Sequence, residues 1–68
     1  MPSYCVHYLT DIEPELSGNI VGSVFFHDQS LEETERNARA RSADFENASA
    51  FIMLGMGGRV HMLKALAE

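Results

Sequence analysis

The sequence contains a single cysteine, Cys5. A disulfide within one chain is therefore excluded, although chains of this length often need a disulfide, a metal or a partner subunit for stability. Sparse cysteine is typical of proteins from reducing compartments. We therefore expect a cytoplasmic protein, in the bacterial host cytoplasm if the chain is encoded by a phage.

The sequence also lacks long apolar runs and has no Lys or Arg before Arg36. A membrane-spanning helix needs about 20 consecutive apolar residues, and a secretory signal peptide begins with a basic stretch. Neither pattern is present, so no membrane partner is expected. With 68 residues, the chain predicts a single domain over residues 1–68.

The sequence contains ten acidic and five basic residues, giving a formal net charge of −5. A negative surface repels nucleic acid and attracts basic protein surfaces. Direct binding of nucleic acid is therefore disfavoured. The alternative is that the charge only keeps a small protein in solution.

Alternating aromatic and β-branched residues predict strands over 4–9 and 20–27. Pro14 and Gly18 mark the segment between them as an exposed loop. Ser30 and Glu33 fit a capping box that opens a helix, with an end near Asn47. Its buried stripe consists mostly of small residues: Leu31, Thr34, Ala38, Ser42 and Phe45.

The apolar run 50–54 predicts a buried strand, the Gly-rich segment 55–58 a turn, and 59–64 a last strand. The predicted fold is α+β, with a small antiparallel sheet in β-β-α-β-β order and one helix packed on one face. The alternative extends the helix to Leu54, ends it at Gly55, and makes 60–67 a second helix.

Few residues combine into a pattern typical of catalysis or metal binding. Cys5, His7, His27 and His61 lack the compact spacing of a zinc site, and Cys5 with His7 and Asp28 forms no recognisable catalytic spacing. Chains of this size also rarely enclose a ligand pocket of about 300 Å³ or more. We therefore predict no enzyme, no catalytic or metal-binding residue and no cofactor.

Two surfaces are easier to explain by binding. Apolar residues on the sheet face away from the helix predict a homodimer interface; together with a methionine in the turn, these are Leu9, Val21, Phe25, Leu63 and Met56. Clustered carboxylates predict an acidic partner-binding patch, which competes with a phosphate backbone for a basic groove; its members are Asp11, Glu13, Glu15, Asp28, Glu32, Glu33 and Glu35.

The overall pattern resembles that of small phage-encoded anti-CRISPR proteins. The segments that carry the resemblance are Gly18-Asn19-Ile20-Val21-Gly22, Ser30-Leu31-Glu32-Glu33, Phe51-Ile52-Met53-Leu54-Gly55 and Val60-His61-Met62. The resemblance implies a non-catalytic inhibitor that occupies a nucleic-acid-binding or subunit-binding surface of an interference complex. It assigns no function to an individual residue.

The leading hypothesis is thus a non-enzymatic, acidic protein that binds and inhibits or modulates a larger, basic nucleic-acid-binding complex, such as a CRISPR-associated complex. One alternative is a homo-oligomeric assembly protein. Another is a small metal or redox protein that uses Cys5 and His7.

Overall fold

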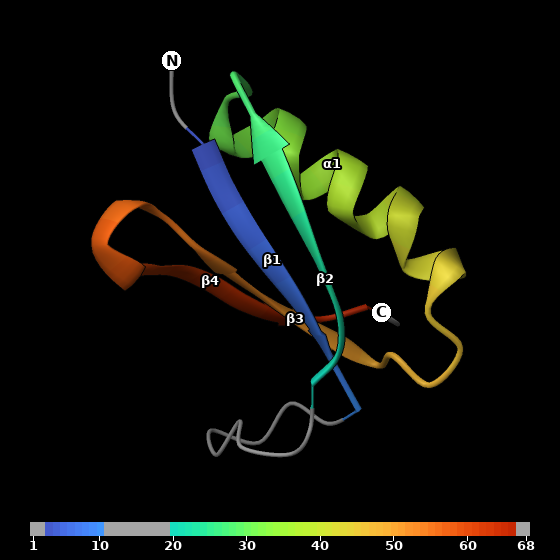
Figure 1. The fold of residues 1–68 in the computed structure, drawn as a ribbon. Helices are drawn as coiled ribbons and strands as arrows, with labels where there is room; N and C mark the ends of the chain where they lie inside the picture. Colours follow the sequence, from blue (N-terminus) through green and yellow to red (C-terminus); the bar gives the residue numbers. More distant parts are fainter. Residues whose placement is uncertain (1–2, 11–19, 67–68) are drawn as a thin grey trace.

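The fold is a four-stranded sheet with one helix packed on one face (Figure 1). A computed structural model describes residues 3–10 and 20–66. The elements in chain order are β1 (Ser3–Leu9), β2 (Ile20–His27), α1 (Leu31–Arg41), the 3₁₀ turn η1 (Ser42–Asp44), β3 (Ala50–Leu54), the 3₁₀ turn η2 (Met56–Gly58) and β4 (Val60–Ala65). The predicted α+β class and β-β-α-β-β order are confirmed. The two-helix alternative is wrong, because 50–54 and 60–65 pair as strands.

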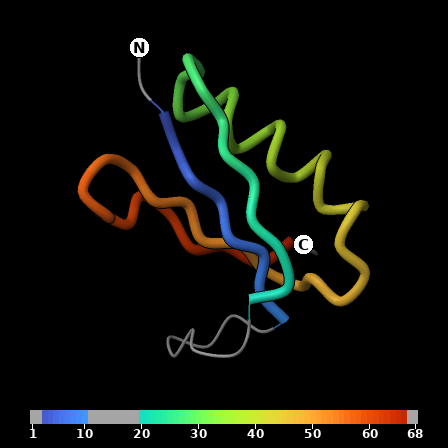
Figure 2. The backbone as a smooth tube through the Cα atoms, viewed as in Figure 1, coloured from blue at the N-terminus to red at the C-terminus, as the bar shows by residue number. Residues whose placement is uncertain are grey.

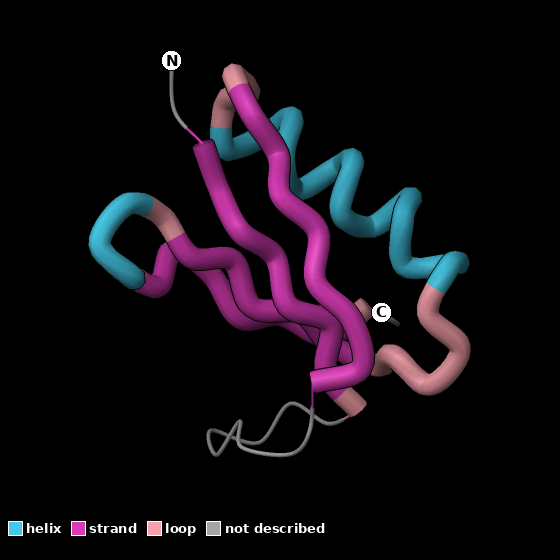
Figure 3. The backbone as a smooth tube through the Cα atoms, in the orientation of Figure 1, coloured by secondary structure: helices cyan, strands magenta, loops and turns pink. Residues whose placement is uncertain are grey.

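The strands lie in the order β2-β1-β3-β4, and every neighbouring pair is antiparallel. Strand β1 is therefore central, and β2 and β3 run parallel to each other on its two sides. Helix α1 connects these two strands across one face of the sheet (Figure 3). The turn between β3 and β4 lies on the opposite side of the molecule from α1 (Figure 2).

Helix α1 begins where its capping chemistry predicts. The Glu33 amide donates to the Ser30 hydroxyl, and the Glu33 carboxylate accepts from the Ser30 amide, each at 3.1 Å. This capping box satisfies two backbone donors that the first turn leaves without helical partners. No helix in the described segments 3–10 and 20–66 is long and apolar enough to cross a membrane.

The helix ends at Arg41, so the predicted end at Asn47 is wrong. The Ser42 amide donates to the carbonyl of Arg39, three residues back, and the Ser42 hydroxyl donates to the same carbonyl at 2.6 Å. The chain thereby tightens into the 3₁₀ turn and becomes extended at Phe45. This early end directs the Phe45 ring toward the sheet.

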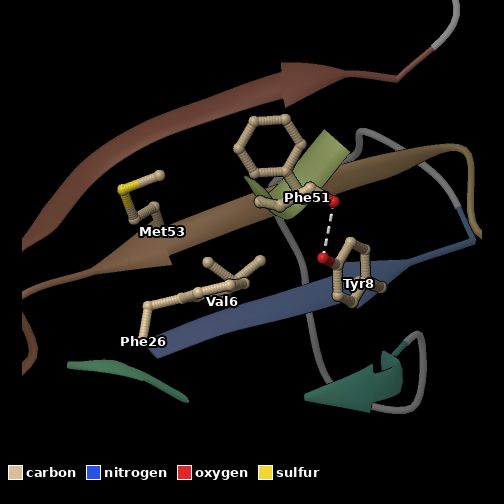
Figure 4. Close-up of a cluster of buried hydrophobic side chains, with 6 residues drawn as sticks. Val6, Tyr8, Phe26, Phe51 and Met53 are labelled. Carbon is tan, nitrogen blue, oxygen red and sulfur yellow. Dashed lines mark hydrogen bonds between the residues drawn. The ribbon is translucent and has the colours of Figure 1, made fainter. Parts of the chain in front are cut away.

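The main core lies between α1 and the sheet (Figure 4). Thr34 and Ala38 are the fully buried residues of the helix, and their small size lets the helix approach the strands closely. The Thr34 hydroxyl donates to the Ser30 carbonyl at 2.8 Å, so its burial leaves no donor unsatisfied. The buried residues of this cluster are Val6, Tyr8, Phe26, Ala38, Phe51 and Met53.

Tyr8 joins the central strand to the end of the helix. Its hydroxyl donates to the Ala38 carbonyl at 2.6 Å (Figure 4). Its ring stacks on Phe45, with centroids 4.6 Å apart and planes at 24°. Burial raises the pKa of Tyr8 to about 12, so the hydroxyl stays protonated and keeps its donor at ordinary pH.

Gly22 on β2 makes room for the Phe45 ring. A Cβ atom at this position would overlap the ring. Because Gly22 pairs with Tyr8 across the sheet, the Phe45 ring lies against two neighbouring residues of β1 and β2 on the same face. The close approach explains the glycine within an otherwise β-branched and aromatic strand.

We predict that Tyr8→Phe lowers the free energy of unfolding by about 1–2 kcal/mol, because the substitution leaves the Ala38 carbonyl without this donor. Urea denaturation measures the change. Tyr4→Phe is the matched control, because the Tyr4 hydroxyl makes no hydrogen bond within the described residues. Equal losses in the two variants would show that the Tyr8 hydroxyl contributes nothing specific.

Candidate functional site

The face of the sheet away from α1, here called the open face, carries no permanent charge. Three rows of its residues cross all four strands, and one further pair joins β1 and β2: Phe25–Cys5–Leu54–Val60, Ser23–His7–Ile52–Leu63, Ile20–Leu9–Ala50–Ala65, and Ser3–His27. None of these residues is Asp, Glu, Lys or Arg. Most of these residues are buried or half-buried, so the absence of charge is informative only at the exposed positions, among them Phe25 and Val60.

Burial divides the open face into two regions. Leu9, Ala50 and Ile52 form a second buried cluster, against which Leu54 and Leu63 pack. The apolar residues exposed at the other end of the sheet are Phe25 (61%), Val60 (55%) and, in the adjoining turn, Met56 (84%). The most exposed apolar residues of the sheet and its turns therefore lie near the β3–β4 turn, whereas Ile20 and Val21 at the start of β2 are less exposed.

The residues predicted for the dimer face fall into these two regions. Phe25 and Val21 are exposed, Met56 is exposed in η2, and Leu63 is half-buried. Leu9 is completely buried within the chain, so it offers no surface to a second copy. Val21 lies at an irregularity in the β1–β2 pairing, between Ile20 opposite Leu9 and Gly22 opposite Tyr8.

A hollow of about 410 Å³ lies at the exposed end of the open face. Its lining includes Cys5, Phe25, His27, Leu54 and Met56. The volume falls within the range of small ligand pockets, contrary to the expectation from chain length. The β3–β4 turn supplies one wall, and sequence reasoning missed the hollow because it arises only when β1, β2 and this turn meet.

Cys5, His7 and Ser23 form a short polar chain on the open face. The Cys5 Sγ lies 3.7 Å from the His7 Nε2, and the His7 Nδ1 lies 2.6 Å from the Ser23 hydroxyl. Nucleophile, base and orienting group follow this order in thiol enzymes. However, burial raises the pKa of Cys5, which favours the less reactive thiol over the thiolate.

The other residues considered as metal ligands or catalytic groups do not contact the Cys5–His7–Ser23 series. Within the described residues, Asp28 bonds to neither Cys5 nor His7, and no three His, Cys, Asp or Glu side chains could hold a metal ion together. The His27 ring packs edge-on against the Phe25 ring, with centroids 5.1 Å apart, and the His61 ring packs edge-on against the Tyr4 ring, with centroids 5.3 Å apart. The pairing of His7 with Ser23 was not foreseen, because it depends on the β1–β2 register.

The carboxylates predicted as an acidic patch have different surroundings. Asp11, Glu13 and Glu15 lie outside the described residues. Glu33 caps the helix, whereas Asp28 and Glu32 are exposed. The Glu35 carboxylate accepts from Lys64 at 3.2 Å and from Arg39 at 3.4 Å, so its charge is balanced locally.

Glu35 connects the helix to strand β4. The hydrogen bond from Lys64 lowers the pKa of Glu35, and Arg39 acts in the same direction, against the opposing effect of burial. Arg39 also donates to the carbonyls of Ala65 and Leu66 at 3.3 and 3.4 Å, and its guanidinium lies 5.4 Å from the Phe51 ring centroid. These residues are therefore structural in the folded chain.

Comparisons with protein-family models, with curated proteins and with solved structures find no significant match to this chain. The resemblance to small anti-CRISPR proteins thus stays a prediction from the sequence pattern.

We predict that Glu35→Gln destabilises the protein at neutral pH and that the difference shrinks as the pH falls. A carboxylate whose pKa is lowered by folding stabilises the folded state at pH values above its pKa in the unfolded chain, which is near 4.5. This contribution disappears as the pH falls and the folded carboxylate becomes protonated. Urea denaturation at neutral pH and at about pH 3 measures the effect. Glu32→Gln is the control, and a difference independent of pH would contradict the ion-pair role.

We also predict that the Cys5 thiol reacts more slowly with iodoacetamide in the folded chain than in the urea-unfolded chain, because burial raises its pKa. The rate should rise about tenfold per pH unit until the thiol titrates. A folded protein that reacts faster than the unfolded chain would instead show that His7 activates the thiolate.

Proposed function

We propose that this protein acts by binding another protein through its open face, without catalysing a reaction. The observation that carries the proposal is the cluster of exposed apolar side chains, Phe25, Val60 and Met56, on a sheet face with no permanent charge. Apolar surface of this kind typically marks an interface. The hollow beside these residues suits an apolar anchor from a partner, the arrangement common at the centre of protein interfaces.

The leading partner is a larger, basic protein complex. The net charge of −5 attracts a basic surface at long range, while the uncharged open face avoids the cost of burying unpaired charges. In its most specific form, the protein inhibits or modulates a nucleic-acid-binding complex, as anti-CRISPR proteins do. Support for this form comes from the resemblance in element order and from the charge.

Self-association is the second candidate, favoured by the absence of charged residues from the open face. Two copies joined face to face would bring no like charges into direct contact there. The interface would also add buried apolar surface to a small core, which a chain of this length needs. In this form the protein is a structural or assembly subunit.

Salt distinguishes the two candidates. Added salt weakens attraction between this acidic chain and a basic complex, but it relieves repulsion between two copies that each carry a charge of −5. Sedimentation of the pure protein and capture of a purified CRISPR-associated complex, each at low and high salt, measure the two trends. The proposed function would be overturned if the protein neither associated with itself nor captured the complex at any salt concentration.

We predict that Phe25→Glu weakens whichever association is observed by about tenfold or more, because the variant places a charge in an apolar contact. Leu31→Glu is the matched control: Leu31 is another exposed apolar residue, 36% accessible, but it begins the helix and lies off the open face. Glutamate in a first helical turn is also well tolerated. Equal losses in both variants would place the interface elsewhere.

The acidic contribution is tested separately by Glu32→Lys, alone and with Glu13→Lys. Glu33 and Glu35 are left unchanged, because one caps the helix and the other binds Arg39 and Lys64. Capture of a basic complex should weaken and become less dependent on salt. Unchanged capture would show that the partner is recognised through the apolar face alone.

A further inference from the structure

A second binding surface lies at the free edge of β2. This strand is at one end of the sheet order and pairs only with β1, so the backbone groups on its other side have no strand partner among the described residues. An edge strand presents its unpaired N–H and C=O groups as a template for another extended chain. This surface adjoins the open face at Phe25 and His27, but it is formed by the backbone edge, whereas the open face is formed by side chains.

The β2 edge has no charged residue or proline to protect it from pairing. From Ile20 to His27 it contains no Lys, Arg, Asp, Glu or Pro. The opposite edge, β4, carries Lys64 and has an irregularity opposite Met53 and Leu54. Lysines and bulges discourage pairing with a further strand. Strand β2 also has an irregularity, at Val21, but it lies outside residues 24–27 and β2 carries no lysine. The two edges of the sheet therefore differ in charge, and residues 24–27 of β2 are the stretch open to strand addition.

A groove of about 360 Å³ runs along this edge. It is lined by four consecutive strand residues, 24–27, and by Asn37, Ala40 and Arg41 of α1. Side chains of consecutive strand residues point to opposite faces, so a groove that touches all four must follow the backbone edge. The three helix residues are spaced as one helical face. The groove therefore lies between the β2 edge and one side of α1.

We propose that the β2–α1 groove binds an extended peptide segment of a partner protein, which adds to the sheet as a fifth strand. The backbone of β2 supplies the hydrogen bonds, and the small side chain of Ala40 leaves room for an apolar side chain of the peptide. This is the recognition mode of strand addition, in which the backbone gives affinity and alternate side chains give specificity.

The polar groups around the groove favour a peptide whose central segment is uncharged. The Arg41 Nε donates to Asp44 at 3.1 Å, and Asn37 donates to Gln29 at 2.9 Å, so the polar groups of the helix wall are already partnered. The net charge of −5 favours basic residues at the ends of the bound segment. The fitting ligand is thus an extended apolar segment with basic flanks.

A second copy of this chain fits the groove less well. Antiparallel pairing of two β2 strands would keep both helices on the same face of the joined sheet. Each helix already lines the edge of its own β2, so the two helices would crowd over the junction. A peptide strand brings no such helix.

The test uses a set of synthetic peptides of about ten residues, with valine, isoleucine, leucine or phenylalanine at alternate positions, threonine between them and lysine at both ends. Titration into the ¹⁵N-labelled full chain should shift the amide resonances of 20–27 and 37–41 and slow hydrogen exchange at β2 amides. Methylating the peptide nitrogens along one edge should weaken binding about fivefold or more, because it removes backbone donors.

Ala40→Arg should weaken peptide binding about tenfold, because the longer side chain occupies the groove. Ala40 is exposed and arginine is a good helix former, so the fold is retained. Ala43→Arg is the matched control, with the same charge change at an exposed position outside the groove. Val60→Glu, on the open face, should leave peptide binding unchanged.

The inference fails if none of the peptides shifts the β2 amides, if nitrogen methylation has no effect, or if the shifts map to the open face. It also fails if the β2 shifts depend on the concentration of the protein alone, which would identify a second copy as the occupant. Phe25 lines both hollows, so Phe25→Glu does not separate the two surfaces. Because Val60→Glu tests the open face away from the groove and Ala40→Arg tests the groove, failure of one surface leaves the other result intact.

Discussion

The contact between Tyr8 and the end of helix α1 is the constraint on which the two-layer arrangement depends. The Tyr8 hydroxyl binds the Ala38 carbonyl, and its ring stacks on Phe45 beside Gly22. The contact therefore links the central strand, an edge strand, the helix and the turn after it. Few residues of α1 are buried, so a small number of contacts has to hold the helix on the sheet.

With the helix fixed on one face, two other surfaces have no partner element among residues 3–10 and 20–66. One is the exposed end of the open face, with Phe25 and Val60. The other is the free edge of β2, which faces the groove beside Ala40. Both follow from the same geometry, since a single helix can cover only one side of a four-stranded sheet.

Charge is distributed in a way that keeps these surfaces neutral. On the described part of the chain, Glu35 is balanced by Arg39 and Lys64, and Arg41 is balanced by Asp44. The rows of the open face and the whole of β2 contain no permanent charge. Under the proposed function, the negative surplus would act at long range on the rate and salt dependence of association, while apolar contacts and backbone hydrogen bonds would determine what is bound.

Local patterns in the sequence determined the elements: the alternation of β1 and β2, the capping box at Ser30 and the glycines of the β3–β4 turn. Each depends on interactions within a few residues. Tertiary structure alone decided the helix end at Arg41, the burial of Leu9, the pairing of His7 with Ser23, and the groove beside β2. These features depend on which strands pair, in which register, and where the helix lies, and such long-range contacts leave no local signature in the chain.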